Sequence, residues 1–393
     1  MRSNSNTIFT TLKNTNVDYI AVAITPWHAI GIDAFLFKKA KEYNRRINGI
    51  IIILPNNNKY VVHENNFSCD SFTDVNFYYI ENLSYQKFTS IFNNLIGEGF
   101  NILKGIKNSR NSKNNEKRLY LISPWTPYLP FIEYFKDKEI ASKYKPIFVV
   151  IDEGVGIYVN KKSNELGIKH ASKFSILAEI KLKSYDYADR LLRKISLRYV
   201  PLEKKFVFEH GSSMKRNEDT INLYKKIIEI RSNDLGLHED NVALLVTQPL
   251  SEYKMVSKQH ECDIIQEIIQ LFKENKVKVV IKPHPSETKN KYDYLKNNNV
   301  KIINNNFPVE EIIPNLNPIC VIGTLSTALI NSKVLFNITS VSIVNLLKTD
   351  NDLMEYTIQD FKKLSTNFII FVDSSDEIIK MLDLNSNKDK NPS

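Results

Sequence analysis

Short apolar runs alternate with longer mixed segments throughout the first half of the chain. Residues 18–24, 49–54, 77–82, 118–123 and 146–151 are apolar runs of strand length, and the intervening residues 27–43, 85–104 and 128–135 have the periodicity of helices. Strands separated by helices pair in parallel, because each helix carries the chain back across the sheet. This half therefore predicts a doubly wound α/β domain.

The second half repeats this alternation. Its apolar runs are residues 241–247, 277–282, 300–303, 319–323 and 340–344, with a helix predicted over 261–276. A chain of 393 residues is long enough for two α/β domains. The polar stretch 204–225 is the best linker, so we expect Rossmann-like domains over residues 1–210 and 211–393, with a cleft between them.

The composition is that of a globular protein of a reducing compartment. Hydrophobic residues make up 42% of the chain and charged residues 25%. The three cysteines are far apart in the sequence, which argues against a disulfide framework and a zinc site. Because no apolar run has the length of a signal peptide or a bilayer span, we expect a cytoplasmic protein.

The net charge of +9 is unevenly distributed. Residues 181–205 hold eight basic residues against three acids, and Arg190, Arg193, Lys194 and Arg198 lie near the centre of this segment. The pattern predicts either contact with an anionic partner or a solvated helix face. Nucleic acid is not expected as the partner, because no nucleic-acid-binding motif accompanies the charge.

The first candidate motif is a pair of acids, Asp152 and Glu153, between the strand at 146–151 and Gly154. Successive side chains of an extended chain point in different directions, so one carboxylate can face outward while the other fixes the turn. The outward carboxylate can serve as a general base toward a hydroxyl group. A turn or a helix cap is the alternative interpretation.

The second motif is Lys282-Pro283-His284-Pro285, which follows the strand at 277–282. The two prolines restrict the backbone on both sides of His284 and hold the imidazole out at the strand end. There it can donate to a leaving phosphate, with the positive charge of Lys282 nearby. The alternative is a structural histidine in a proline-rich turn.

The third motif begins at Gly323, where residues 323–328 follow a strand and open a helix. Ser326 and Thr327 stand at the helix N-terminus, whose free N–H groups attract one phosphate. An ordinary helix cap explains the same residues equally well.

A strand-to-helix corner near the N-terminus is a candidate for acceptor contact. His28 lies there beside Trp27, and Trp125 occupies a similar corner. An indole can stack on a sugar, but packing in the core is the commoner role.

Taken together, VIDEGVGIY, VIKPHPSE and IGTLSTALI resemble the D/E-D/E-G, HP and S-S/T motifs of bacterial sialyltransferases. The chain is most similar to the capsular polysialyltransferase family, and next to the lipooligosaccharide sialyltransferases, from residue 18 to about residue 347. The resemblance implies a GT-B fold and inverting transfer of sialic acid from CMP-sialic acid to a sialylated glycan in capsular polysialic acid synthesis. It also implies that no metal or other cofactor is needed.

The resemblance assigns roles to the motif residues. Glu153 would be the general base, Asp152 would orient the turn, and His284 would assist the departure of CMP. Glu310 would bind the ribose, with Glu311 as the competing choice. The CMP-binding set would comprise Lys282, Pro285, Gly323, Ser326, Thr327 and Glu310, and the acceptor-binding set Arg190, Arg193, Lys194, Arg198 and His28.

Several alternatives remain open. The donor could be another CMP-activated nonulosonate or Kdo, or a UDP-sugar, and the acceptor could be a lipooligosaccharide. A polyanionic glycan is the expected partner of the basic segment, and the inner face of the cytoplasmic membrane, with its capsule-assembly proteins, is the alternative. A non-catalytic capsule-assembly adaptor is the non-enzyme alternative, against which the intact Glu153 and His284 argue.

Overall fold

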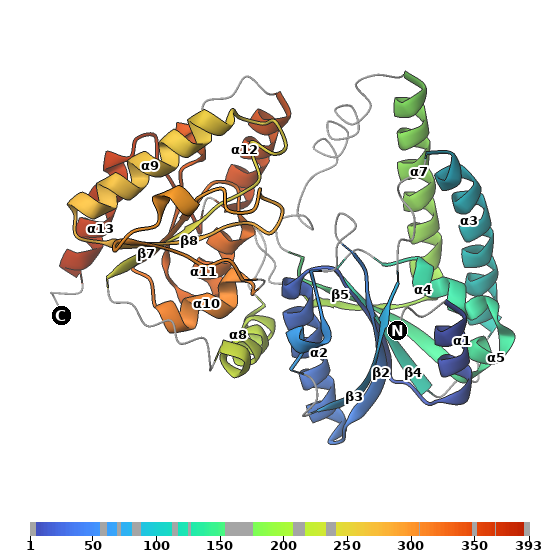
Figure 1. The fold of residues 1–393 in the computed structure, drawn as a ribbon. Helices are drawn as coiled ribbons and strands as arrows, with labels where there is room; N and C mark the ends of the chain where they lie inside the picture. Colours follow the sequence, from blue (N-terminus) through green and yellow to red (C-terminus); the bar gives the residue numbers. More distant parts are fainter. Residues whose placement is uncertain are drawn as a thin grey trace. The chain divides into compact units, whose positions relative to one another are not determined.

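The computed structural model describes residues 5–55, 61–68, 72–80, 88–111, 117–124, 127–153, 176–206, 217–232, 241–305, 307–347, 352–365 and 367–388. The chain forms two compact units. Unit 1 comprises Met1–Ile157, Ile168–Phe208 and Asn217–Ile227, and unit 2 comprises Tyr158–Gly167, Glu209–Arg216 and Ile228–Ser393. Each unit contains a six-stranded sheet flanked by helices (Figure 1).

The sheet of unit 1 is parallel and has the strand order β3-β2-β1-β4-β5-β6. Its strands are β1 (Tyr19–Ala23), β2 (Ile47–Ile53), β3 (Thr73–Tyr79), β4 (Lys117–Ser123), β5 (Tyr144–Ile151) and β6 (Leu202–Phe206). The order reverses between β1 and β4, as in a Rossmann fold. The predicted doubly wound sheet is therefore confirmed.

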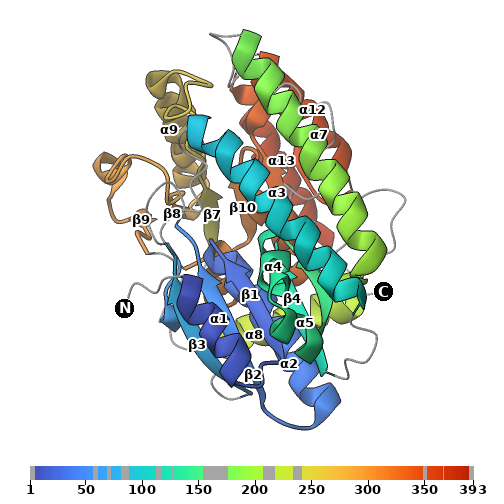
Figure 2. The same ribbon diagram turned by 90° about the vertical axis from the view of Figure 1, so that its right-hand side faces the viewer.

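Alternate residues of the unit 1 strands build a core on one face of the sheet. Ile20, Val22, Ile50 and Ile52 belong to this core, together with side chains from the covering helices. Helices α3 and α7 lie side by side on this face (Figures 1 and 2). The helices of unit 1 are α1 (Ser5–Asn14), α2 (Pro26–Tyr43), α3 (Phe88–Asn111), α4 (Pro130–Glu133), α5 (Lys138–Lys143) and α7 (Ile176–Tyr199).

The sheet of unit 2 repeats the same topology, with the order β12-β11-β10-β7-β8-β9 and all pairs parallel. Its strands are β7 (Val242–Val246), β8 (Lys278–Lys282), β9 (Val300–Ile302), β10 (Cys320–Gly323), β11 (Thr339–Ser342) and β12 (Ile370–Phe371). Its helices are α9 (Lys258–Glu274), α10 (Val309–Leu316), α11 (Thr327–Phe336), α12 (Asp352–Ser365) and α13 (Asp376–Lys388). The order reverses between β7 and β10, which is where ligands bind in such sheets.

The stretch expected as a linker, residues 204–225, overlaps two elements. Strand β6 ends at Phe206, and helix α8 (Glu218–Ser232) begins within the same stretch. β6 is an edge strand, and edge strands keep charged side chains, so its sequence LEKKF has no apolar run. The division between the units falls at Phe208 and again inside α8, after Ile227.

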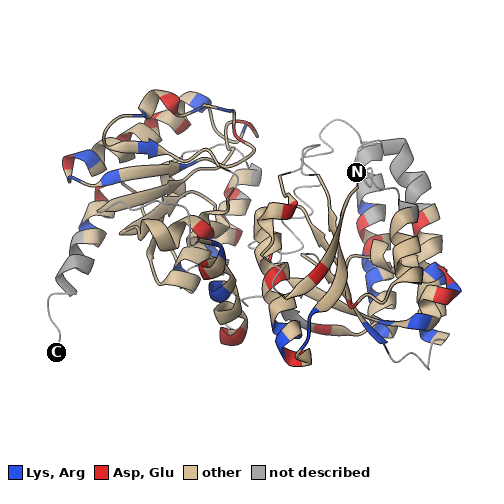
Figure 3. Cartoon of the chain, turned by 60° about the horizontal axis from the view of Figure 1, so that its bottom comes forward, with Lys and Arg blue, Asp and Glu red and all other residues tan. Residues whose placement is uncertain are grey.

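Charged residues lie mainly on helices and strand ends, while most of each sheet is uncharged (Figure 3). The strands on either side of the reversal point in unit 2, β7 and β10, contain no charged residue. Polar residues that could bind a ligand therefore follow the carboxyl ends of these strands and do not lie within them.

Candidate functional site

The acidic pair of unit 1 stands directly after β5. Asp152 is fully buried and Glu153 is half-buried, so the two carboxylates have different access to solvent. The backbone N–H of Asp152 donates to the hydroxyl of Tyr224 at 3.1 Å. The division of roles between the two carboxylates, in which Asp152 fixes the turn and Glu153 is the base, stays a prediction. Gly154 lies outside the described residues.

The two motifs of unit 2 begin on strands that share β7 as their neighbour. Val246 pairs with Gly323 of β10 on one side and with Lys282 of β8 on the other. Because neighbouring strands lie about 4.8 Å apart, Gly323 and Lys282 are about 10 Å apart. The His-Pro and Ser-Thr motifs therefore leave the same edge of the sheet.

Gly323 allows β10 to pack closely against β7. A Cβ atom at this position would lie 2.7 Å from Val246 Cγ2 and 2.8 Å from the Val246 carbonyl oxygen. Any larger residue would push the third motif away from the second.

The imidazole of His284 is oriented by its own turn. Its Nδ1 accepts a hydrogen bond from the backbone N–H of Ser286 at 3.1 Å, so the proton of the neutral ring is on Nε2. Burial lowers the pKa of His284, which favours this neutral form. The ring can thus offer one N–H donor to an anion.

Glu287 holds the His284 turn from three residues further on. Its Oε2 accepts from the His284 backbone N–H at 2.7 Å and from the Thr247 hydroxyl at 2.5 Å. Its Oε1 accepts from Tyr292 at 2.6 Å and from Lys291 at 3.2 Å. Four donors therefore saturate one buried carboxylate.

The sequence analysis did not select Glu287 or Thr247. For Glu287 the sequence signal is an acid three residues after His284, and in the structure its backbone N–H also donates to the His284 carbonyl at 3.0 Å. This reciprocal pattern resembles a capping box, in which an acid bonds back to the backbone three residues before it. Thr247 carried no such signal.

Lys282 is buried at the end of β8. Its Nζ donates to the Asn305 carbonyl oxygen at 2.7 Å, and burial lowers the pKa of Lys282 to about 8. A lysine with this pKa is largely charged at neutral pH and loses its charge as the pH rises through 8.

Ser326 is the N-cap of α11. Its hydroxyl oxygen accepts from the backbone N–H of Ala328 at 3.3 Å, and Thr327 begins the helix. A helix N-terminus with two hydroxyl groups, those of Ser326 and Thr327, is of the kind that binds a phosphate group, and this role stays a prediction. Pro285, the other predicted donor-binding residue of this unit, is exposed beside His284.

The two acids of α10 have different partners. Glu311 forms an ion pair with Arg231 at 2.6 Å, and both side chains are buried. Glu310 accepts a hydrogen bond from the side-chain amide of Asn331 on α11 at 2.6 Å. Because Glu311 is committed to its ion pair, Glu310 is the better candidate for a ligand contact.

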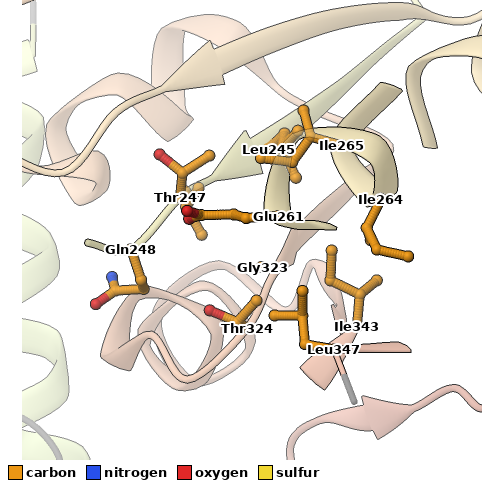
Figure 4. Close-up of a pocket in the computed structure, with 11 residues that line it drawn as sticks. Leu245, Thr247, Gln248, Glu261, Ile264, Ile265, Gly323, Thr324, Ile343 and Leu347 are labelled. Carbon is orange, nitrogen blue, oxygen red and sulfur yellow. The ribbon is translucent and has the colours of Figure 1, made fainter. Parts of the chain in front are cut away.

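A small cavity lies at the reversal point of the unit 2 sheet, between the ends of β7 and β10 (Figure 4). Its volume of about 20 Å³ accommodates one water molecule. The Thr324 hydroxyl is buried here and has no hydrogen-bond partner among the described residues. The cavity is lined by Leu245, Val246, Thr247, Gln248, Glu261, Ile264, Ile265, Gly323, Thr324, Ile343 and Leu347.

The predicted acceptor-binding arginines of α7 are partly occupied. Arg190 pairs with Asp186, and Arg193 pairs with Asp189 at 2.5 Å. Lys194 and Arg198 are exposed. No ion pair joins either of these two to another residue in the described part of the chain.

His28 is buried at the start of α2. Its Nδ1 accepts from the backbone N–H groups of Ile24 at 3.2 Å and Thr25 at 3.3 Å, which gives it a capping role. Burial lowers the pKa of His28 to about 3, so the ring is neutral. An acceptor contact by His28 stays a prediction. Trp125 lies outside the described residues.

The described residues contain neither a metal-binding cluster nor a membrane-spanning helix. No group of three or more His, Cys, Asp or Glu side chains in that part of the chain could hold a metal ion. No helix within the described ranges is long and apolar enough to cross a membrane.

The two Rossmann-like units have the architecture of the GT-B glycosyltransferases. In unit 2, His284 and the N-terminus of α11 lie at the same edge of the sheet. The family model for alpha-2,8-polysialyltransferase (POLYST) matches residues 19–345, and the chain belongs to this family. It is accordingly a sialyltransferase, which takes a nucleotide-sugar donor and a glycan acceptor. No curated protein matches the sequence.

Solved structures with a similar course of the chain come from several enzymes. The UDP-GlcNAc 2-epimerase from Methanocaldococcus jannaschii is 15% identical, with a TM-score of 0.46 over 93% of this chain and 91% of that one. The alpha/beta-galactoside alpha-2,3-sialyltransferase from Photobacterium phosphoreum is 14% identical, with a TM-score of 0.39 over 90% and 97%. The E. coli heptosyltransferase WaaC is 7% identical, with a TM-score of 0.40 over 93% and 99%.

Proposed function

We propose that the chain is an inverting, metal-independent sialyltransferase that moves sialic acid from CMP-sialic acid to a sialylated glycan, in the synthesis of capsular polysialic acid. The observation that carries the proposal is the register of β10, β7 and β8, which brings His284 and the N-terminus of α11 to one edge of the unit 2 sheet. Membership of the polysialyltransferase family supports the choice of sugar.

The donor phosphate would meet several hydrogen-bond donors and one positive charge. The N–H groups of α11 and the Ser326 hydroxyl would bind its oxygens, the neutral His284 would donate from Nε2, and Lys282 would supply charge. Negative charge grows on the phosphate as its bond to the anomeric carbon breaks. Groups that bind more strongly as this charge grows accelerate the step.

The acceptor hydroxyl would attack the anomeric carbon from the opposite face. Its oxygen forms the new glycosidic bond, CMP leaves with the electron pair of the broken bond, and Glu153 takes the hydroxyl proton. A single displacement of this kind inverts the configuration. The half-buried Glu153 supports this role better than the fully buried Asp152 does.

The basic helix α7 is proposed to meet the polyanionic glycan or the anionic inner face of the cytoplasmic membrane. Ile180, Tyr187, Leu191, Lys194 and Arg198 recur at helical spacing along one exposed side of α7. Exposed apolar residues next to basic ones are typical of helices that lie on a membrane surface, which supports the membrane alternative.

The test is transfer by the purified protein from CMP-sialic acid, CMP-Kdo and a UDP-sugar to lactoside and oligosialic acceptors, with products separated by length. We expect transfer from CMP-sialic acid and elongation of oligosialic acceptors. Glu153→Gln should reduce kcat by about 10² to 10⁴-fold. Its affinity for CMP should be unchanged, because Glu153 and the CMP-binding residues belong to different units.

Two outcomes would overturn these assignments. Transfer from the UDP-sugar alone would refute the donor. A Glu153→Gln variant with wild-type turnover, beside an inactive Asp152→Asn variant, would exchange the roles of the two acids.

A further inference from the structure

Tyr224 of α8 reaches the acidic motif from far along the chain. Its ring is fully buried in unit 1, and its hydroxyl accepts the Asp152 backbone N–H at 3.1 Å. This backbone N–H bonds to a side chain and not to a neighbouring strand, because Asp152 stands just beyond the end of β5. The phenol therefore fixes the peptide that leads directly into Glu153.

A glycine on α2 makes room for this phenol. Gly31 lies in the interior of α2, where glycine is less favourable than alanine. A Cβ atom there would lie 2.5 Å from the Tyr224 hydroxyl oxygen and 3.2 Å from Ile151 Cδ1. One turn earlier on α2, the Trp27 ring packs against Tyr224 with centroids 5.2 Å apart. Gly31, Trp27 and Ile151 thus form a socket for Tyr224.

The chemistry of Tyr224 suits a positioning role. Burial raises the pKa of Tyr224 well above its usual value, so the phenol stays neutral at any pH at which the enzyme works. A neutral hydroxyl can accept the Asp152 N–H bond permanently without exchanging protons with substrate.

From this socket we infer that Tyr224 is a positioning residue for the general base: its hydroxyl fixes the Asp152 backbone and so holds the Glu153 carboxylate toward the acceptor. The inference rests on the proposed function and deepens it. A base displaced by even 1 Å can lose about 10²-fold in rate, so a hydroxyl that fixes the adjacent peptide has a measurable effect on turnover.

The experiment compares Tyr224→Phe with a matched variant at the other end of the same strand. Tyr144 begins β5, is fully buried, and its hydroxyl accepts the Val17 backbone N–H at 3.2 Å. Tyr144→Phe therefore removes the same kind of accepted hydrogen bond in the same unit, far from the motif. It also removes the bonds that the Tyr144 hydroxyl donates to the carbonyl oxygens of Thr15 at 2.7 Å and Leu12 at 3.2 Å. We expect Tyr224→Phe to lower kcat by about 10- to 100-fold with an unchanged KM for CMP-sialic acid, and Tyr144→Phe to leave kcat unchanged.

Two further variants separate positioning from folding. Gly31→Ala keeps the tyrosine but places a methyl group 2.5 Å from its hydroxyl oxygen, which displaces the phenol, so it should lower kcat in the same way. In a Glu153→Gln background, Tyr224→Phe should cause no further loss, because the base that it positions is already absent. Circular dichroism checks that each variant is folded.

The result that would overturn the inference is a Tyr224→Phe enzyme that turns over like wild type or like Tyr144→Phe. An additional loss in the Glu153→Gln background would overturn it as well. Failure of the proposed function itself is recognised separately, by a wild-type protein that does not transfer from CMP-sialic acid or by an active Glu153→Gln variant.

Discussion

The most informative substitution near the proposed CMP site is at Glu287, because its carboxylate accepts hydrogen bonds from four groups. An alanine at position 287 would leave the His284 N–H, the Thr247 hydroxyl and the Tyr292 hydroxyl without this acceptor. A hydrogen bond to a charged group contributes about 1.5–3 kcal/mol, and losses within one network are not additive. We expect Glu287→Ala to lower the free energy of unfolding by about 3–5 kcal/mol, the range for breaking a buried charged network.

Glu287→Gln should behave differently. The amide carbonyl can still accept at the His284 and Thr247 end, while the amide NH₂ turns toward Tyr292 and Lys291. Lys291 tolerates this, because its Nζ keeps bonds to other acids, at 2.7 Å to Glu261 and 3.1 Å to Glu252. The Tyr292 hydroxyl can turn to accept from the amide, so the glutamine variant should lose about 1.5–3 kcal/mol, the contribution of the charged bond from Lys291.

Activity should separate the two variants more clearly than stability does. In Glu287→Gln the His284 turn keeps its acceptor, and kcat should stay near wild type. In Glu287→Ala the turn is released, and kcat should fall by about 10- to 100-fold.

The assays are thermal unfolding and initial rates with saturating CMP-sialic acid. For a unit of this size, each kcal/mol corresponds to about 2–4 °C in Tm. If both variants are destabilised as expected and both keep wild-type kcat, then the bond from Glu287 to the His284 backbone has no catalytic role, and our interpretation of the turn is wrong.

Two further predictions concern charge. Because burial lowers the pKa of Lys282 to about 8, its charged form is lost as the pH rises through 8, and the Kd for CMP should increase above this pH. The Lys282→Met variant should bind CMP more weakly and without this pH dependence, as measured by calorimetry. Replacing Lys194 and Arg198 with Gln should weaken binding to anionic vesicles, or raise the KM for long sialylated acceptors, at low salt. Replacing Arg190 and Arg193, which are paired with acids, should have a smaller effect. Equal effects of the two double variants would contradict the assignment of this surface.

The sheets could be predicted from the sequence because their central strands are apolar throughout. Strands β1, β7 and β10 are completely buried, and a strand buried on both faces must be a continuous apolar run. β6 was missed for the opposite reason, since an edge strand tolerates charged side chains. Helix α8 was missed because the expected linker extended over its first half.

The motif residues could be predicted because the carboxyl ends of parallel strands gather at one edge. Their supporting partners could not be predicted, because these contacts join distant parts of the chain. Tyr224 lies 72 residues from Asp152, and Thr247 lies 40 residues from Glu287. Asn331 lies 21 residues from Glu310, on the next helix. No local pattern in the sequence distinguishes these partners from other buried polar residues.

The negative charge of the buried acids near His284 repels a phosphate. Glu287 offsets this repulsion in part, because it raises the pKa of both His284 and Lys282 against the lowering effect of burial. Without an anion, burial dominates, and both groups are less basic than in water. An arriving phosphate adds a second negative neighbour, which raises both pKa values further and favours the uptake of a proton. Glu287 therefore keeps Lys282 basic enough to be largely charged at neutral pH, and the phosphate of the donor strengthens that charge further.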